Sequence, residues 1–406
     1  MSPRCDVAIV GAGPYGLSVA AHLRAAGVDT RVFGKPLGTW RAHMPKNMTL
    51  KSDGFASNLS APSQDSTLKA WCERHRKPYA NQGLPVELDD FLAYGADFIT
   101  RYTPGVAETM VGHVETGADG YHLSLENGDR VSASRVVIAA GISCFPYTPP
   151  ALAALSSACL SHSYDHREGE AFAGKEVVII GAGASAIDLA ALLHDCGANV
   201  RIVVRAPFIE YNSVPDPDAE TLLYRLRRPA SGIGRGWSSY FCANAPVLFY
   251  RLPEPLRRRG IQSHMHPAAG WFMREKIEGR IETLLGREIA GAQEKGSRVT
   301  LTLSARSGNL EEISCDHVIA ATGYRPDTRR LRFLAPSLRS RIGSARHTPI
   351  VSDNFETPAN GLYVIGPAVI DSFGPLMRFM VGAEFIAPRL GNHLAKMLGV
   401  SARRAA

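Results

Sequence analysis

Two glycine-rich stretches carry the residues whose spacing points most directly to chemistry. Gly11, Gly13 and Gly16 follow the apolar run "DVAIV" and precede a segment with helical spacing that ends at Gly27. In such a turn the first glycine allows a tight bend, the second lets the backbone approach a pyrophosphate, and the third lets the helix pack on the strand. Because the strand–turn–helix context is complete, the pattern predicts a dinucleotide phosphate site rather than a turn alone.

A second unit repeats this arrangement near the middle of the chain. The strand "KEVVII" leads to Gly181, Gly183 and Ala186, followed by the helical segment "IDLAALLHDCG" and the strand "NVRIVV". An acidic residue at the end of that second strand commonly binds ribose hydroxyls, whereas an arginine suits a 2′-phosphate. The position is Arg205, with Arg201 nearby, which favours NADPH over NADH. An arginine that only ends the strand is the alternative.

The first unit departs from the usual pattern at the corresponding place. Gly34, followed by Lys35, stands where a ribose-binding acidic residue is common. The ribose contact of such a carboxylate is therefore missing here, while the phosphate site is unaffected.

Composition limits the class of protein. The chain has 406 residues, 45% hydrophobic and 20% charged, which indicates a globular protein of two or three domains. Its net charge of +7 comes from short arginine clusters. We interpret these clusters as solvated faces rather than a nucleic-acid surface, because no aromatic residues alternate with them. The seven cysteines lie far apart without a C-x-x-C pair, which argues against a disulfide framework or a metal site.

Targeting and membrane segments are also not expected. No signal-peptide pattern precedes the first strand, and no apolar run approaches the ~20 residues of a membrane helix. The sequence therefore predicts a cytoplasmic protein without stable membrane insertion and without a nucleic-acid partner.

Three further stretches extend the pattern over the rest of the chain. "RVVIAAG" at 135–141 and "DHVIAATGYRPD" at 316–327 each end a buried strand in a turn of small residues, and "NGLYVIGPAVIDSFGPLMRF" spans 360–379. With the two glycine units, these stretches resemble the two-dinucleotide-binding-domain flavoproteins. The resemblance implies an α/β fold of two Rossmann-like, three-layer domains, with FAD on the first unit and NADPH on the second.

Within this superfamily the chain is most similar to flavin-containing and N-hydroxylating monooxygenases. "PLGTWRAHMPKNMTLKSDGF" at 36–55 looks like their Gly-x-Trp stretch and the segment beneath the flavin, "LPVELDDFLAYGADF" at 84–98 like the helix that follows, and "LSHSYDH" at 160–166 like their histidine-centred fingerprint. The resemblance implies that NADPH reduces FAD, that a flavin hydroperoxide forms with dioxygen, and that a small nucleophilic substrate, N- or S-containing or heteroaromatic, is oxygenated.

A second function remains open beside this one. An NAD(P)H-dependent flavoprotein reductase or dehydrogenase would share the same nucleotide units but pass electrons to a partner protein or a quinone. A disulfide reductase is disfavoured, because a single thiol cannot both form and resolve a disulfide.

The resemblance also assigns site residues. Ser52 and Asp53 stand near the place of an asparagine that supports the hydroperoxide, with Asn58 as the alternative in a shifted register. Met377 is expected to begin a helix facing the flavin, and His162 to orient the nicotinamide nucleotide or to join the hinge between domains. The expected cofactor-binding residues are Gly11, Gly13, Pro14, Tyr15, Gly16, Gly34, Lys35, Trp40, Lys51, Ala140, Gly141, Gly181, Gly183, Ala184, Ser185, Ala186, Arg205, Thr322, Gly323, Tyr324, Gly366, Pro375, Leu376 and Met377.

A discontinuous domain organisation follows from the same resemblance. Residues 1–160 and 317–406 would form the FAD-binding domain, and 161–316 an inserted NADP-binding domain. Its segment 206–285 is rich in proline and aromatic residues and is expected to form loops and short helices rather than strands. A lid over the substrate, a homodimer contact and a satellite core remain open for this segment, and a membrane contact is the least favoured interpretation.

Overall fold

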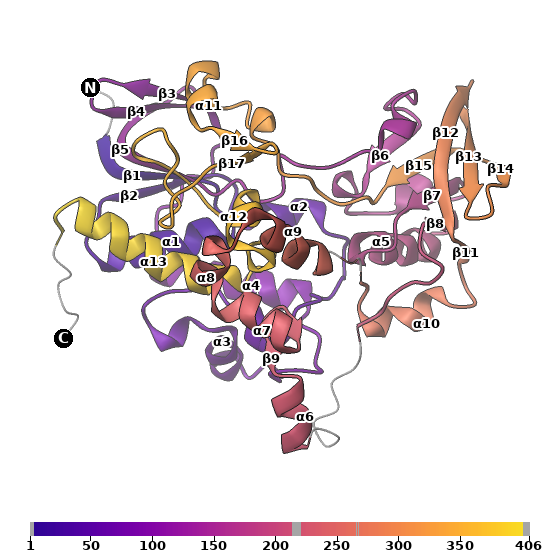
Figure 1. Ribbon diagram of the computed structural model, residues 1–406, viewed down its shortest axis with the longest axis horizontal. Coiled ribbons are helices and arrows are strands. Elements are labelled where there is room, and N and C mark those ends of the chain that lie inside the picture. Colours follow the sequence, from indigo (N-terminus) through magenta and orange to yellow (C-terminus); the bar gives the residue numbers. More distant parts are fainter. Residues whose placement is uncertain (1–3, 213–220, 265, 267, 401–406) are drawn as a thin grey trace.

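A six-stranded sheet forms the first half of the molecule. The computed structural model describes residues 4–212, 221–264, 266 and 268–400 (Figure 1). Strands β2, β1, β5 and β18 of this sheet are parallel, and β4 and β3 continue it beyond β5 as antiparallel strands. Their bounds are Arg4–Val10 (β1), Thr30–Phe33 (β2), Val111–Gly117 (β3), Gly120–Leu125 (β4), Arg130–Ile138 (β5) and Leu362–Val364 (β18).

A second, fully parallel sheet of five strands lies in the other half, in the order β11-β8-β7-β15-β6. An antiparallel sheet of three strands, β12-β13-β14, packs on one of its faces through a common apolar cluster, and a helix covers the other face. The bounds are Leu160–His162 (β6), Glu176–Ile180 (β7), Asn199–Val204 (β8), Glu282–Leu285 (β11), Arg287–Lys295 (β12), Arg298–Ala305 (β13), Leu310–Cys315 (β14) and His317–Ala320 (β15). The observed architecture is the predicted α/β class.

The helices that begin at the glycine turns pack on these sheets. Helix α1 (Pro14–Ala25) lies beside α13 (Gly382–Met397) against the first sheet, and α5 (Ala184–Asp195) covers the second. Their buried faces consist mainly of small and branched apolar residues, with Tyr15, Ser18 and Asp188 as exceptions, so that burial rather than helix propensity stabilises them. The remaining helices of this part of the fold are α2 (Gly38–His43), α3 (Leu68–His75), α4 (Leu88–Tyr102), α11 (Pro336–Arg341) and α12 (Ile370–Phe373).

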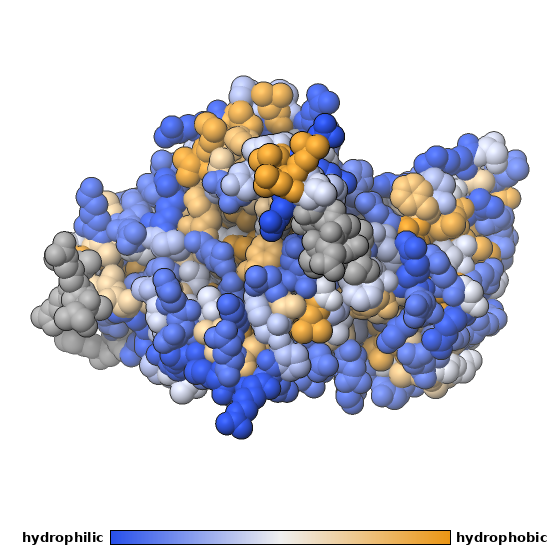
Figure 2. All heavy atoms as spheres, turned by 90° about the horizontal axis from the view of Figure 1, so that it is seen from below, coloured by the Kyte–Doolittle hydropathy of each residue, from blue (hydrophilic) through white to orange (hydrophobic). Residues whose placement is uncertain are grey.

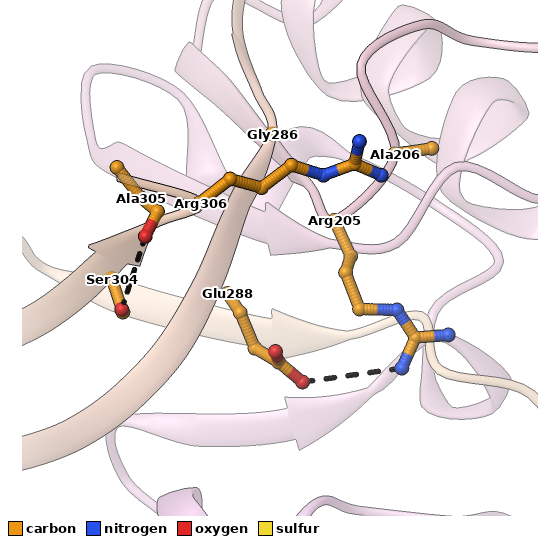
Figure 3. Close-up of a pocket in the computed structure, with 7 residues that line it drawn as sticks. All are labelled: Arg205, Ala206, Gly286, Glu288, Ser304, Ala305 and Arg306. Atoms are coloured by element: carbon orange, nitrogen blue, oxygen red, sulfur yellow. Dashed lines mark hydrogen bonds and ion pairs between the residues drawn. The ribbon is translucent and has the colours of Figure 1, made fainter. Parts of the chain in front are cut away.

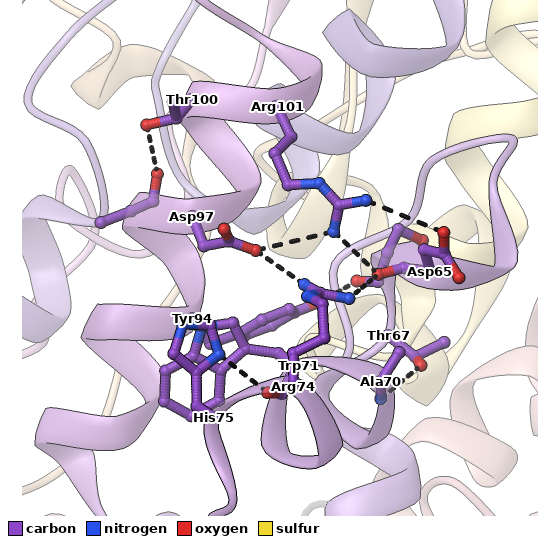
Figure 4. Close-up of polar contacts among 12 residues, drawn as sticks. Asp65, Thr67, Ala70, Trp71, Arg74, His75, Tyr94, Asp97, Thr100 and Arg101 are labelled. Atoms are coloured by element: carbon purple, nitrogen blue, oxygen red, sulfur yellow. Dashed lines mark hydrogen bonds and ion pairs between the residues drawn. The ribbon is translucent and has the colours of Figure 1, made fainter.

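Helix α4 anchors the chain that leads to the site. The hydroxyl of the buried Tyr94 donates to the carbonyl of Ser66 at 2.6 Å and accepts from the amide of Leu59 at 2.8 Å. On the outer side, Arg74 of α3 lies 2.8 Å from Asp97 of α4 (Figure 4). These contacts fix the segment between α2 and α3, which carries the predicted residues 51–58.

The segment 206–285 connects the halves through short elements. Residues 213–220 of it lie outside the described residues. Unlike the prediction of loops and helices alone, the segment also contains a two-stranded hairpin and the edge strand β11. The hairpin consists of β9 (Ala230–Ser231) and β10 (Gly234–Arg235), and the helices are α6 (Leu222–Arg227), α7 (Trp237–Asn244), α8 (Pro246–Arg251), α9 (Glu254–Ser263) and α10 (Arg274–Ile277).

One expected helix differs in the structure. The helix expected to begin at Met377 is a short 3₁₀ helix at Pro375–Arg378, and the α-helix α13 begins only at Gly382. Gly374, with φ at +84°, precedes Pro375, whose fixed backbone suits the start of a tight turn. Among the described residues, no helix is both long and apolar enough to cross a bilayer.

Candidate functional site

The first glycine turn has the geometry of a phosphate cradle. Gly11 has φ at +117°, and a Cβ there would lie 2.3 Å from the carbonyl oxygen of Ala139. A Cβ on Gly16 would lie 1.9 Å from the carbonyl oxygen of Gly11, so this glycine permits the contact between helix and strand. A Cβ on Gly13, in contrast, would meet no atom within 4 Å. The protein therefore leaves open space only at the glycine where a pyrophosphate would approach.

The second turn repeats this geometry. Gly181 has φ at +136°, and a Cβ there would lie 2.4 Å from the carbonyl oxygen of Ala321. Gly183 caps helix α5 in an extended conformation, as Gly13 caps α1. Ala186 takes the third position and is fully buried. Both turns thus direct a free helix N-terminus towards the carboxyl edge of their sheet, where anions are stabilised.

Gly34 has a structural explanation. Its φ is +128°, a conformation that side chains rarely adopt, and a Cβ would lie 3.3 Å from the amide nitrogen of Ala12. Its own amide donates to the carbonyl of Ala107 at 3.0 Å. Gly34 therefore packs against the cradle, and the neighbouring Lys35 is exposed.

Several predicted residues meet at the carboxyl edge of the first sheet. Ala140 and Gly141 follow β5, and Gly366 follows the adjacent β18. The Tyr15 hydroxyl, buried in α1, donates to the carbonyls of Met377 at 3.1 Å and Phe379 at 2.6 Å. Burial raises the pKa of this phenol, so it stays a donor. The cradle helix thus holds the 375–379 turn, which contains Pro375, Leu376 and Met377, at the same edge.

A cavity of about 770 Å³ lies between the two halves, beside the start of α5. The first half contributes Trp40, Lys51, Ser52 and Asp53 to its walls, and the second half contributes Ala184 and Ser185 at the start of α5, together with Asp188. Parts of 206–285 close it, including Tyr211, Tyr224, Arg228, Arg235, Trp271 and Phe272, and Arg378 and Phe379 complete the lining. The structure thus brings together residues that the sequence analysis assigned separately.

The two predicted catalytic residues that line the cavity are held by hydrogen bonds. The hydroxyls of Ser52 and Ser57 are 2.7 Å apart, and Ser57 also donates to the carbonyl of Asp53 at 2.9 Å. The Asp53 carboxylate accepts from the Gln82 amide at 3.4 Å, and Arg235 donates to that same amide's oxygen at 3.0 Å. Burial raises the pKa of Asp53, which brings it closer to a protonated donor, while the nearby Arg235 opposes this shift.

Asn58 lies away from the cavity lining. Its amide nitrogen donates to the carbonyl of Phe55 at 3.0 Å and to Glu384 at 3.1 Å, and its oxygen accepts from the Leu68 amide at 2.9 Å. These bonds cap α3 and tie this loop to α13. The amide is therefore engaged in positioning the loop.

Lys51 and Asp188 join the two halves inside the cavity wall. Lys51 Nζ lies 2.7 Å from Asp188 Oδ1, 3.0 Å from the carbonyl of Thr49, and 4.6 Å from the centre of the Phe272 ring. Burial lowers the pKa of Lys51 and raises the pKa of Asp188, while each partner opposes the shift of the other. Asp188 was missed as a site residue, although an acidic side chain within the apolar run of the second helix is a visible signal.

Trp40 lines the cavity and packs on the neighbouring helix. Its ring centre is 5.6 Å from that of Phe91 in α4, and its carbonyl accepts from Arg167 of the second half at 3.3 Å. Trp40 thus lies where the two halves and the cavity meet.

The A-T-G-Y turn and His162 connect, by hydrogen bonds, the two chain segments that pass from one half to the other. Thr322 donates its hydroxyl to the carbonyl of Tyr147, and the Gly323 carbonyl accepts from both Tyr147 and, at 3.1 Å, His162 Nε2. The ring of Tyr324 lies against the rings of His162 and Tyr164. Since His162 is buried and accepts from the Tyr164 amide through Nδ1, the structure places it at the crossing.

Arg205 lies in a separate pocket at the end of β8. This pocket of about 390 Å³ is also lined by Arg306, Ser304, Glu288 and Gly286 (Figure 3). Arg205 Nη1 is 3.9 Å from Glu288 Oε1, and most of its side chain is exposed. Arg306, in the turn between β13 and β14, was missed because nothing in the sequence links this hairpin to β8. Arg201 instead donates to the carbonyl of Ser314.

The cysteines and metal-ligating residues add no further site. All seven cysteines are free thiols, and burial raises the pKa of Cys242 and Cys315 to about 11. Among the described residues, no group of three histidine, cysteine or carboxylate side chains is placed to hold a metal ion.

The two sheets, each with a glycine cradle at the carboxyl edge of its parallel strands, define a two-dinucleotide-binding flavoprotein. The chain belongs to the pyridine nucleotide-disulphide oxidoreductase family, whose model matches residues 8–225. Within this superfamily it is a member of the flavin monooxygenases. It is 30% identical to the indole-3-pyruvate monooxygenase YUCCA1 of Oryza sativa subsp. japonica, over 88% of this chain and 85% of that protein.

The chain also resembles a reductase in sequence and a hydroxylase in fold. The chain is 25% identical to a ferredoxin–NADP reductase of Thermus thermophilus, over 73% of this chain and 85% of the reductase. The fold superimposes on that of the ornithine N-hydroxylase KtzI of Kutzneria sp. 744, in a structure with reduced FAD, NADP⁺ and L-ornithine. The TM-score is 0.77, with 16% identity, and the match covers 98% of this chain and all of the hydroxylase chain.

Proposed function

We propose that this protein is an FAD-dependent, NADPH-using monooxygenase that oxygenates a small nucleophilic substrate containing nitrogen or sulfur, or a heteroaromatic ring. The observation that carries the proposal is the cavity between the two halves, which residues 51–53 of the first half and Ala184 and Ser185 at the start of α5 line together. In such an enzyme the nicotinamide, the flavin and the substrate must meet at one point. We expect this cavity, which lies between the two halves, to provide the space for them.

The residues present fit both cofactors. The open approach to Gly13, compared with the closed approaches to Gly11 and Gly16, suits the pyrophosphate of FAD. The corresponding cradle of α5 suits the pyrophosphate of NADPH. Its domain would be 161–316 together with β15, which pairs with β7 and β6 in the second sheet, and the remainder of the chain would be the FAD domain. Bound flavin would supply the redox and oxygen chemistry, so the chain needs no nucleophile or metal of its own.

NADPH use is supported by the pocket at the end of β8. Arg205 and Arg306 place two guanidinium groups around one small pocket, and Ser304 adds a hydroxyl. Guanidinium groups form charge-assisted hydrogen bonds with phosphate. Glu288 pairs with Arg205, so a 2′-phosphate would take the place of this carboxylate as the partner of Arg205.

The chain's own part in the reaction is to orient the substrate and to exclude water. Aromatic side chains, including Trp40, Phe55, Trp271 and Phe272, line much of the cavity. Arg228, Arg235 and Arg378 add positive charge, while the charge of Lys51 is paired with that of Asp188. Such a lining suits a small ring or amine compound that carries an anionic group. YUCCA1 is named for indole-3-pyruvate and KtzI was solved with L-ornithine, which supports a substrate of this size.

Electron transfer to a partner protein or quinone is the second candidate function. It is supported by the likeness to ferredoxin–NADP reductases, which covers most of the chain. The same cradles would serve both reactions, so the two functions differ only in the fate of the electrons.

Labelled dioxygen separates the two functions. The purified holoenzyme is supplied with NADPH, ¹⁸O₂ and a panel of amines, thioethers and heteroaromatic acids, and products are analysed by mass spectrometry. We expect one ¹⁸O atom in a product and substrate-dependent NADPH consumption. Stoichiometric hydrogen peroxide with every panel member, together with rapid reduction of ferredoxin or a quinone, would contradict oxygenation.

A further inference from the structure

The segment 221–264 forms an exposed apolar surface that neither cradle uses. Seven of the fourteen large apolar side chains that are strongly exposed in the part of the chain described lie in it. They are Leu222, Leu223, Leu226, Trp237, Tyr240, Leu248 and Leu256. Exposed apolar side chains concentrated in this way mark an interaction surface rather than ordinary surface composition.

Helix α6 divides its side chains between two faces. At about 100° per residue, Leu222, Leu226 and Leu223 fall within one arc, while Tyr224 points to the opposite side. The leucines are 58–74% exposed, and Tyr224 lines the cavity. Arg225 and Arg227 flank the leucine arc and are exposed. The helix thus turns a cationic, apolar face outward while its inner face closes the substrate cavity.

Helix α7 extends the same surface. The indole nitrogen of Trp237 donates to the carbonyl of Leu226 at 3.1 Å, although 62% of this residue stays exposed. The ring of Tyr240 lies 5.7 Å from that of Trp237. In Figure 1 α6 projects below the body of the molecule, and Figure 2, seen from that side, shows a hydrophobic group beside hydrophilic residues. We call Leu222, Leu223, Leu226, Trp237, Arg225 and Arg227 the α6 surface.

The positive charge around the α6 surface favours an anionic partner over a second copy of this chain. Residues 213–264 contain eight arginines and four carboxylates, of which only Glu254 lies in 221–264. A symmetric contact with a second copy would bring this patch against itself and set arginines against arginines. An anionic lipid surface instead offers negative charge to the arginines and an apolar boundary to the leucines and the indole.

We propose that the α6 surface docks this protein onto membranes that contain anionic phospholipids. The leucines and Trp237 enter the boundary between headgroups and acyl chains, and Arg225 and Arg227 pair with lipid phosphates. Because Tyr224 of this short helix and Arg228 at its end line the cavity, docking places the cavity wall next to the bilayer. Binding of this kind is peripheral and reversible.

Vesicle flotation with the full-length holoenzyme tests this proposal. One set of vesicles contains phosphatidylcholine alone, and the other contains equal amounts of phosphatidylcholine and phosphatidylglycerol. We expect the protein to float only with the anionic vesicles and to be released by salt. L222S/L223S/L226S and R225Q/R227Q should each lower the partition coefficient about tenfold or more.

A matched control carries the same chemical change elsewhere. L310S/I350S/M397S replaces three exposed apolar residues outside the segment and should float like the wild type. Failure of the wild type to float, equal binding to neutral vesicles, or loss of binding in the control as large as in the α6 variant would overturn the proposal. A dimer that L222S/L223S/L226S converts to monomer, without vesicle binding, would assign the surface to a second copy.

Discussion

Lys51 Nζ and Asp188 Oδ1 lie 2.7 Å apart, so one buried ion pair links the loop after α2 to the helix of the second cradle. The side chains are 17% and 5% exposed. Burial lowers the pKa of Lys51 and raises the pKa of Asp188, which means that desolvation outweighs the mutual attraction in both groups. The pair therefore fixes an arrangement of the halves at a cost in stability.

Breaking this pair on one side is expected to destabilise the protein more than removing it entirely. K51M leaves a buried carboxylate unpaired, and D188N leaves a buried ammonium, so each should lower the free energy of unfolding by about 1–3 kcal/mol. The double variant K51M/D188L should recover most of this loss. Chemical denaturation of the three variants measures the effect.

An exposed ion pair provides the control. Lys69 Nζ and Glu73 Oε1 are 3.9 Å apart on the surface of α3, and K69M should change stability by less than about 0.5 kcal/mol. If K51M were as mild as K69M, or if the double variant were less stable than both single variants, the interpretation of Lys51–Asp188 would be wrong.

Gly13 and Gly16 should respond oppositely to alanine. A Cβ on Gly16 would lie 1.9 Å from the Gly11 carbonyl oxygen, so G16A should cost about 3 kcal/mol of folding free energy or more. A Cβ on Gly13 meets nothing within 4 Å and its backbone is extended, so G13A should cost no more than about 1 kcal/mol. G13A should nevertheless weaken FAD binding, because the added methyl occupies the approach of the pyrophosphate.

Fluorescence titration of apoprotein with FAD, beside denaturant unfolding of the same samples, separates the two effects. Gly291 in β12 also has an open Cβ position, has no positive φ and lies outside the cradles and the cavity, so G291A serves as a reference for an added methyl group. FAD affinity in G13A equal to that of the wild type would exclude Gly13 as the pyrophosphate contact.

Local patterns in the sequence were sufficient to predict the α/β fold and both cradles. Each cradle is encoded within about thirty residues, because strand, turn and helix follow one another directly. The helix expected at Met377 was misplaced, since Gly374 and Pro375 start a 3₁₀ turn there. That turn depends on Tyr15, which no local pattern connects to it.

Contacts between distant segments could not be predicted. Lys51 meets Asp188 only because the loop after α2 folds against helix α5, and Arg205 shares a pocket with Glu288 and Arg306 only because β8, β12 and the turn after β13 lie together. Gly34 is the reverse case. The missing carboxylate was visible in the sequence, but its reason, the close approach to Ala12, required the folded backbone.

Stability should depend on pH through His22. This side chain lies between α1 and α13, its Nε2 is 3.0 Å from the Ser60 hydroxyl, and burial lowers its pKa to about 4. The unfolded chain then binds the proton more tightly than the folded one. The contribution is present above the unfolded pKa of about 6.5 and is lost as pH falls towards 4, by roughly 2 kcal/mol for a partly exposed group.

Unfolding free energies of the wild type and H22Q across this range isolate the effect, because other groups contribute equally to both curves. H22Q should flatten the decline below about pH 6.5. H113Q, which changes an exposed histidine on β3, should follow the wild type. Parallel curves for H22Q and the wild type would show that His22 does not titrate in this way.

Arg205 and Arg306 should together determine the preference for NADPH. Each contributes a guanidinium to the pocket at the end of β8, so R205A and R306A should each raise the KM for NADPH about tenfold, with about a twofold effect on NADH. E288Q removes the carboxylate that pairs with Arg205 and should lower the KM for NADPH. Because the pocket is exposed, higher salt should weaken the binding of NADPH but not the binding of NADH.

R201A is the matched control. Arg201 donates to the Ser314 carbonyl instead, so this variant should leave the preference for NADPH unchanged. Steady-state kinetics with both nucleotides measure these KM values. An equal rise in KM for NADH and NADPH would mean that the two arginines support the fold of the pocket rather than bind the 2′-phosphate.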